Sequence, residues 1–280
     1  MGPRLRRINR RTALKTLVAA GVGAATGGGI YSYRYSRRAL ETSRVTVPVA
    51  GLSDAHSGLR IGLLTDIHCS QWVSGEDVKY AVDRLMAERP DLIVLGGDYV
   101  TWGDRKYVGP SAEALGALSA PHGVFGVLGN HDDDHDMASE LAARDVRVLK
   151  DARTRLTINH EPLELAGIRF WTKKASEIAA VLRGASGTVV LLAHDPRRLA
   201  EAAALKVPLV LSGHTHGGQI VLPGLGAIAA RKFPVVAGRA TRDSTTMFVS
   251  RGLGTVYVPV RMNCPPEVAV LTLRPSAAPL

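Results

Sequence analysis

The chain has 280 residues, 46% of them hydrophobic, which is enough to bury one large core or two small ones. Its formal net charge of +10 is unevenly distributed, because residues 1–44 hold ten of the 35 Lys/Arg residues and one of the 25 acids. The rest of the chain is almost neutral and has no broad basic face to neutralise many phosphates. This distribution argues against DNA or RNA as the main partner, so no nucleic acid is expected.

The basic residues gather in an N-terminal leader. Residues 9–15 (NRRTALK) are similar to twin-arginine export signals, and a Gly/Ala-rich apolar stretch from Leu17 to Ile30 follows them. That stretch is shorter than the roughly 20 apolar residues of a bilayer-spanning helix. We expect residues 1–43 to engage the twin-arginine export machinery and residues 44–275 to form one domain in the cell envelope, at the outer face of the cytoplasmic membrane, in the periplasm or in the cell wall. A retained N-terminal membrane anchor and a disordered basic tail are the alternatives.

Strands and helices alternate in the first half of the domain. Buried strands are predicted at five short apolar runs: Ile61–Thr65, Leu92–Leu95, Val124–Leu128, Val189–Ala193 and Leu209–Ser212. Ser74 and Asp77 have capping-box spacing, and they predict a helix that ends before Pro90. Further helices are predicted near Ser111–Ser119, Asp134–Ala143, Ser176–Leu182 and Pro196–Ala204.

Later segments read as strands without long helices between them. They are Val146–Leu149, Arg153–Ile158, Leu163–Phe170, Met247–Ser250, Val256–Val260 and Val268–Leu273. Two stacked mixed sheets with helices outside accommodate both patterns, so the predicted class is α/β.

Polar side chains that bind metals follow each of the five buried runs. The motifs are Asp66-Ile67-His68, Gly96-Gly97-Asp98, Gly129-Asn130-His131-Asp132, His194 and Gly213-His214-Thr215-His216. Open α/β sheets hold their ligands at this edge, and oxygen and nitrogen donors without a cysteine pair suit Zn, Mn or Fe. Seven candidate ligands are too many for one tetrahedral ion, but they fit two ions that share a carboxylate. Any one of these histidines alone would be read as an ordinary polar residue.

The order and spacing of the motifs resemble those of calcineurin-like metallophosphoesterases, from about Val45 to Leu273. The resemblance implies a four-layer αββα sandwich of two mixed sheets flanked by helices. It also implies a role for each motif residue: Asp66, His68 and His216 would bind the first metal, Asn130, His194 and His214 the second, Asp98 would bridge both, His131 would face the leaving group, and Asp132 would orient His131.

The implied activity is hydrolysis of phosphodiester or pyrophosphate bonds by a hydroxide that bridges the two metal ions. His131 would give a proton to the leaving oxygen, and the free amide nitrogen of Asn130 would contact the phosphate. One alternative is a broad phosphomonoesterase or nucleotidase that acts on soluble substrates. Another is a non-catalytic binding scaffold, which the presence of all seven ligand positions and His131 disfavours.

The substrate is less sharply indicated. Protein phosphatases of this superfamily carry an arginine shortly after the second motif, and Arg105 is not in the matching place, which puts phosphoprotein substrates in doubt. The segments 214–223 and 263–267 are similar to an exported, membrane-associated branch of phosphodiesterases that includes enzymes cleaving UDP-2,3-diacylglucosamine. Trp72 and Trp102 follow metal motifs, which predicts contact with a lipid-linked ester or a membrane surface. The alternative is that these rings only pack their loops.

The two cysteines, Cys69 and Cys264, are too few for a disulfide framework. A single bridge between them is left open by the sequence.

Overall fold

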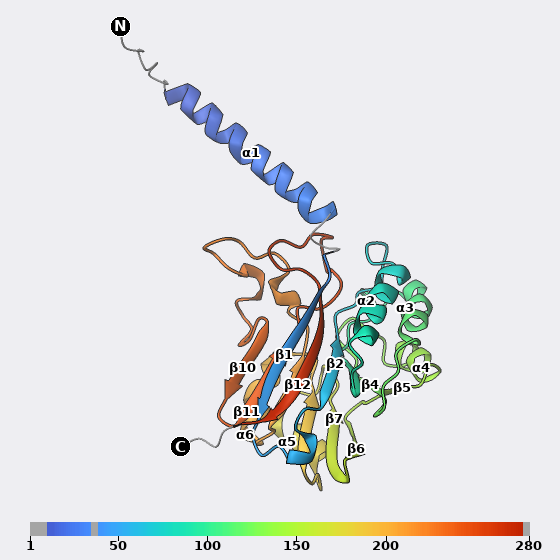
Figure 1. Cartoon of the computed structure of the whole chain (residues 1–280). Helices are drawn as coiled ribbons and strands as arrows, with labels where there is room; N and C mark the ends of the chain where they lie inside the picture. Colours follow the sequence, from blue (N-terminus) through green and yellow to red (C-terminus); the bar gives the residue numbers. More distant parts are fainter. Residues whose placement is uncertain (1–9, 35–38, 277–280) are drawn as a thin grey trace.

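Two stacked six-stranded sheets form the body of the molecule (Figure 1). This computed structural model describes residues 10–34 and 39–276. The first sheet has the order β1 (Glu41–Val49), β12 (Glu267–Pro275), β2 (Arg60–Leu64), β3 (Leu92–Leu95), β4 (Val124–Gly126) and β5 (Val146–Val148). The second has the order β10 (Gly238–Arg242), β11 (Thr245–Val249), β9 (Leu209–Ser212), β8 (Thr188–Leu192), β7 (Glu161–Gly167) and β6 (Ala152–Ile158). Both sheets are mixed, because β12 runs antiparallel to β2, and β6 and β10 run antiparallel to their neighbours.

Helices cover the outer face of each sheet. The helices are α2 (Gly75–Ala87), α3 (Val108–Leu115) and α4 (Asp136–Ala142) on the first sheet, and α5 (Ala175–Leu182) and α6 (Leu199–Ala204) on the second. Three apolar clusters separate the four layers, one between the sheets and one under each set of helices. The predicted αββα sandwich is therefore confirmed.

The central strands read as unbroken apolar runs because both of their faces are buried. In β2, Ile61 and Leu63 point into the core between the sheets, while Leu64 points toward the helices. In β3, Leu92 and Val94 face the inter-sheet core in the same way. Strands buried on both sides carry no polar alternation, which is why the sequence pattern located them.

The helix α2 begins as predicted. Ser74 Oγ accepts a hydrogen bond from the Asp77 N–H at 3.2 Å, and the Asp77 carboxylate accepts one from the Ser74 N–H at 2.9 Å. This reciprocal pair satisfies two N–H groups that the first turn leaves without helical partners. The predicted capping box is confirmed.

One predicted strand is wrong. The segment Val256–Val260 is a loop, and the side chain of Gln219 takes the hydrogen-bonding place of a neighbouring strand. Gln219 Nε2 donates to the carbonyls of Val256 and Val258 at 3.1 and 2.9 Å, and its Oε1 accepts the Val256 N–H at 2.9 Å. The apolar side chains of this segment consequently line cavities instead of a sheet core.

A long helix, α1 (Arg10–Arg34), precedes the sheets and extends away from them (Figure 1). Among the helices of the described ranges, none combines the length and the apolar character needed to cross a bilayer. Asn9 of the predicted export motif lies outside the described residues, as do residues 1–8 and 35–38 of the predicted leader.

Candidate metal centre

The five motifs meet at one edge of the sandwich, past the carboxyl ends of β2, β3 and β4 in the first sheet and of β8 and β9 in the second. The residues arrive as follows: Asp66 and His68 after β2, Asp98 after β3, Asn130 and His131 after β4, His194 after β8, and His214 and His216 after β9. Asp66 joins the two sheets at this edge, because its carboxylate accepts the His214 N–H at 2.9 and 3.0 Å.

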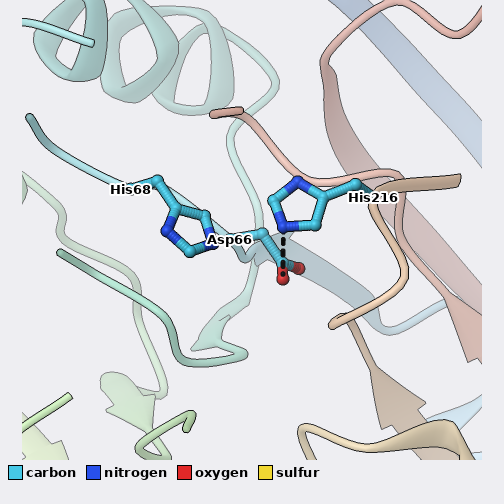
Figure 2. Close-up of side chains that lie close together, drawn as sticks. All are labelled: Asp66, His68 and His216. Atoms are coloured by element: carbon cyan, nitrogen blue, oxygen red, sulfur yellow. Dashed lines mark ion pairs between the residues drawn. The ribbon is translucent and has the colours of Figure 1, made fainter. Parts of the chain in front are cut away.

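One group of ligand atoms comes from Asp66, His68 and His216 (Figure 2). These atoms lie within 4.8 Å of one another, and His216 Nε2 is 3.5 Å from Asp66 Oδ1. All three side chains are buried, and Thr65 Oγ1 donates to Asp66 Oδ2 at 2.7 Å. These are the residues predicted to bind the first metal.

A second group comes from Asp98, His194 and His214. Asp98 Oδ2 lies 3.1 Å from His194 Nε2 and 3.5 Å from His68 Nε2, so this one oxygen faces both groups. His214 Nδ1 and His194 Nε2 approach each other at 3.2 Å. This position of Asp98 is the one required of a carboxylate shared by two ions.

The hydrogen bonds of the site test whether it fits divalent cations. His194 Nδ1–H donates to the carbonyl of Gly96 at 2.7 Å, and His68 Nδ1 lies 3.1 Å from Thr101 Oγ1, so both rings turn Nε2 inward. Metal-bound histidines are held in this way by an oxygen on the far ring nitrogen. His68 Nε2 and Asn130 Oδ1 are buried and have no hydrogen-bond partner among the described residues. Buried polar atoms need partners, so these clustered side chains suit a dinuclear metal site.

The carboxylates make the site attractive to positive charge. Burial raises the pKa of Asp98, but the neighbouring His194 and His68 outweigh it and bring that pKa well below its usual range. Burial likewise lowers the pKa of His194, and the Asp98 carboxylate overcomes it and raises that pKa to about 10. The buried Asp98 carboxylate is therefore ionised, and the protonated His194 beside it supplies the compensating charge. A metal ion at this place would replace that proton, because histidine binds metals in its neutral form.

Backbone strain is concentrated at the same residues. Five candidate ligands have φ between +48° and +72°, the left-handed region that side chains other than glycine rarely adopt: Asp66, His68, Asp98, His214 and His216. Each such residue costs on the order of 1–3 kcal/mol, and strain of this kind gathers at functional sites. Close packing holds it in place, since a Cβ on Gly252 would lie 2.5 Å from Asp66 Cβ.

A sequence profile of calcineurin-like phosphoesterases matches residues 59–218, the span that carries all five motifs. The chain belongs to the calcineurin-like phosphoesterase family. It is 31% identical to the metallophosphoesterase YkuE of Bacillus subtilis, over 96% of this chain and 99% of that one. A metallophosphoesterase of Helicobacter pylori is 30% identical over 95% of this chain and 73% of its own length. The phosphodiesterase YaeI of Escherichia coli is 30% identical over 80% of this chain and 86% of its own.

This phosphoesterase is a metal-dependent phosphoric ester hydrolase, and His131 stands beside its metal centre. A ring nitrogen of His131 lies within 4.8 Å of ligand atoms of His68 and Asp98. The Trp102 N–H donates to His131 Nδ1 at 3.0 Å, which leaves the proton of a neutral ring on Nε2. The indole of Trp102 also packs on the imidazole, with ring centroids 4.3 Å apart.

The prediction that Asp132 orients His131 is wrong. Both oxygens of Asp132 are taken by backbone donors, namely the N–H groups of Gly129, Asp98 and Tyr99 at 2.7–2.8 Å. Asp132 therefore ties the loop after β4 to the loop after β3. The ring of His131 is held instead by the backbone and the indole of Trp102.

The two tryptophans take different positions. Trp102 is 65% exposed and lies between His131 and Tyr257, whose ring centroid is 5.5 Å away. Neither tryptophan lines the cavity over the metal centre, and both line the cavity next to it, but Trp102 packs on His131. The structure thus places Trp102 at the site and Trp72 farther out.

Aromatic residues that the sequence analysis missed flank the second ligand group. The rings of Phe170 and Phe233 lie 5.4 and 5.2 Å from that of His214. Phe170 and Phe233 lie in loops and belong to none of the five motifs, so no signal in the sequence marks them. They wall the centre on the side of the second sheet.

Arg261 was also missed, and it supports the first ligand group from behind. It is fully buried, and its guanidinium donates to the carbonyls of Gly254, Arg251 and Gly252 at 2.6, 2.8 and 3.1 Å. It also reaches the carbonyls of Cys264 at 3.2 Å and His216 at 3.4 Å. The one signal in the sequence that could have indicated Arg261 is its position two residues before the segment 263–267, which is similar to the exported branch of phosphodiesterases.

The two cysteines are free and buried in the structure. The Cys264 thiol donates to the carbonyl of His216 at 3.2 Å, so it backs a candidate ligand. Burial raises the pKa of Cys69 to about 11, which keeps that thiol protonated and unreactive.

Proposed function

We propose that this phosphoesterase hydrolyses phosphodiester or pyrophosphate bonds with two divalent ions, Mn, Zn or Fe. The observation that carries the proposal is the single Asp98 oxygen facing both His68 and His194. Two divalent ions held there would supply a coordinated water of lowered pKa and positive charge for the phosphoryl oxygens. One ion would be held by Asp66, His68 and His216, and the other by Asn130, His194 and His214. Asp98 would be a ligand of both ions.

The remaining groups act on the substrate. The Nε2–H of His131 donates to the leaving oxygen, because its Nδ1 is already occupied by the Trp102 N–H. When Asn130 Oδ1 faces an ion, its NH₂ is free to donate to a phosphoryl oxygen. Lys232 lines the same cavity and attracts an anionic ester.

A lipid-linked ester of the cell envelope is the substrate that we favour. The cavity over the metal centre is about 340 Å³, and Ile220, Tyr257 and Val258 give it apolar walls beside its polar floor. Trp102 is exposed at its edge, where an indole suits an amphiphilic ligand or a membrane surface. Export by the twin-arginine machinery through residues 1–43 would bring the catalytic domain, residues 44–275, to such substrates.

Metal content and ester preference test the proposal. The full chain is stripped with a chelator, reloaded separately with Mn²⁺, Zn²⁺ or Fe²⁺, and assayed for bound metal and for hydrolysis of bis(p-nitrophenyl) phosphate and p-nitrophenyl phosphate. We expect two ions per chain and at least tenfold faster diester hydrolysis. Faster monoester hydrolysis would favour the phosphomonoesterase alternative, and a loaded protein without hydrolysis would favour the binding scaffold.

A further inference from the structure

Three cavities follow one another outward from the metal centre. The cavity over the centre shares Tyr257 and Val258 with a second one of about 490 Å³, which we name the middle cavity. The middle cavity shares Trp72 and Thr255 with a third of about 300 Å³, which we name the outer pocket. The shared lining residues place the three cavities next to one another.

The outer pocket has the chemistry of a hydrocarbon site. Its walls are Leu40, Val73, Leu253 and Pro266, and the half-exposed rings of Trp72 and Tyr80 stand at its rim. Its volume is at the lower end of pockets that bind small molecules. These side chains offer apolar surface and few hydrogen-bonding partners for a polar molecule.

The charged residue in the outer pocket is already engaged. The Asp77 carboxylate accepts the N–H and the hydroxyl of Ser74, at 2.9 and 2.8 Å, in the cap of α2. It is therefore occupied by the fold and does not define a cation site. Most of the remaining side chains that line the pocket are apolar or aromatic.

The middle cavity is polar by contrast. It is lined by Ser70, Gln71, Thr101, Asp104 and Lys106 together with aromatic rings. Thr255, at its boundary with the outer pocket, is only 5% exposed, and its Oγ1 has no hydrogen-bond partner among the described residues. This hydroxyl is therefore a hydrogen-bonding group left without a partner at the boundary between the two cavities.

The outer pocket is fastened to the metal centre through the backbone. The N–H groups of Leu253 and Gly254, which line the pocket, donate to the carbonyls of Thr65 and Asp66 at 3.0 and 2.7 Å. A molecule held in the pocket is thus at a fixed distance from the residues that would bind the metals. Such a fixed distance positions a reacting group for catalysis.

We propose that the outer pocket binds the hydrocarbon chain of an amphiphilic phosphoester. The polar linker of that molecule occupies the middle cavity and contacts Thr255, and its phosphorus lies at the metal centre. This inference rests on the proposed function, since it assigns the apolar part of the substrate to a place in the fold.

The test is a series of p-nitrophenyl phosphodiesters whose other ester group is a short oligo(ethylene glycol) linker ended by an alkyl chain, from ethyl to decyl, assayed with the metal-loaded full chain. We expect KM to fall about fourfold for each methylene group that the pocket buries, with kcat nearly constant, until the pocket is full. Leu40→Trp fills the pocket and should flatten this dependence. The matched control, Leu205→Trp, changes a half-buried leucine at the end of α6 on the second sheet and should keep the wild-type dependence. A KM independent of chain length, or an unchanged dependence in Leu40→Trp, would overturn the proposal.

A binding measurement separates this inference from the proposed function. Calorimetry with n-octanol and the metal-free full chain probes the pocket without any hydrolysis. We expect wild type to bind at least tenfold more tightly than Leu40→Trp. Octanol binding without diester hydrolysis would retain the pocket and refute the proposed function. Diester hydrolysis with equal octanol binding by the two proteins would refute the pocket alone.

Discussion

Replacing Arg261 by methionine should weaken the first ligand group without touching a ligand. Methionine has a similar length and no donors, so the carbonyls that the guanidinium serves lose their partner. Gly252 O keeps a hydrogen bond from the Glu267 N–H, and His216 O keeps those from Gln219 and the Cys264 thiol. Within the described ranges, the carbonyls of Arg251, Gly254 and Cys264 are left without another donor.

The magnitude follows from those three carbonyls. Each buried acceptor left unpaired costs roughly 1–3 kcal/mol, so the lower bound for three is about 3 kcal/mol. Removing the buried charge recovers part of this free energy, so the total stays near the lower bound. Burial lowers the pKa of Arg261 to about 10, which means that it disfavours the charged form. With roughly 2–4 °C per kcal/mol for a chain somewhat smaller than this one, we expect Tm to fall by about 6–12 °C.

The informative assay is metal titration of the chelator-treated protein, followed by calorimetry. Loss of groups that orient metal ligands typically costs about 10–100-fold in metal affinity, and we expect that loss for one of the two ions. The control is Arg153→Met, which removes an arginine bonded to Glu164 and to the carbonyl of Arg183, remote from the centre. It should lower Tm and leave both affinities unchanged. Wild-type affinity for both ions in Arg261→Met would refute the reasoning.

Four further outcomes follow. His131→Ala should lower kcat at least 100-fold and retain both ions by elemental analysis, and loss of metal would contradict its role as a proton donor. Asp98→Ala should lose both ions and activity together, whereas loss of a single ion would show that the carboxylate is not shared. Glu164→Gln should lower the free energy of unfolding at pH 7 by about 2 kcal/mol, because the charge-assisted bonds from two arginines to Glu164 are lost. Burial raises the pKa of Glu164, but the two arginines outweigh it and lower that pKa below 4.5. The stabilisation by Glu164 is therefore full above pH 4.5 and is lost as the pH falls through the folded pKa. Denaturation of both proteins should show that the difference in their free energies of unfolding disappears below pH 4.5. Replacing Arg10 and Arg11 by lysine should keep the protein in the cytoplasmic fraction of a bacterial host, and unchanged fractionation would exclude the export motif.

The sequence predicted those parts of the molecule that depend on neighbours in the chain. Strands such as β3 are apolar on both faces, and the Ser74 cap lies three residues from its partner, so a short window contains each signal. The metal centre was predictable for a related reason. Each motif follows directly on a buried strand, and parallel strands bring their carboxyl ends to one edge.

What the sequence could not show depends on contacts between distant segments. Gln219 replaces a strand neighbour for the segment 256–260, and Arg261 reaches carbonyls of residues 216 and 251–254. The error at Asp132 has a different origin. His131 and Asp132 are adjacent in the chain, but their side chains have different partners. Asp132 accepts from the backbone of the loop after β3, and His131 accepts from the Trp102 N–H, which only the fold shows.

The carboxylates of Asp66 and Asp98 each clamp a second loop by accepting a backbone N–H, from His214 and His131 respectively. These two hydrogen bonds hold the loops of the candidate site to one another through the chain itself. A donor set of oxygen and imidazole nitrogen accepts several transition metals, so we expect metal availability to decide which ions the site takes.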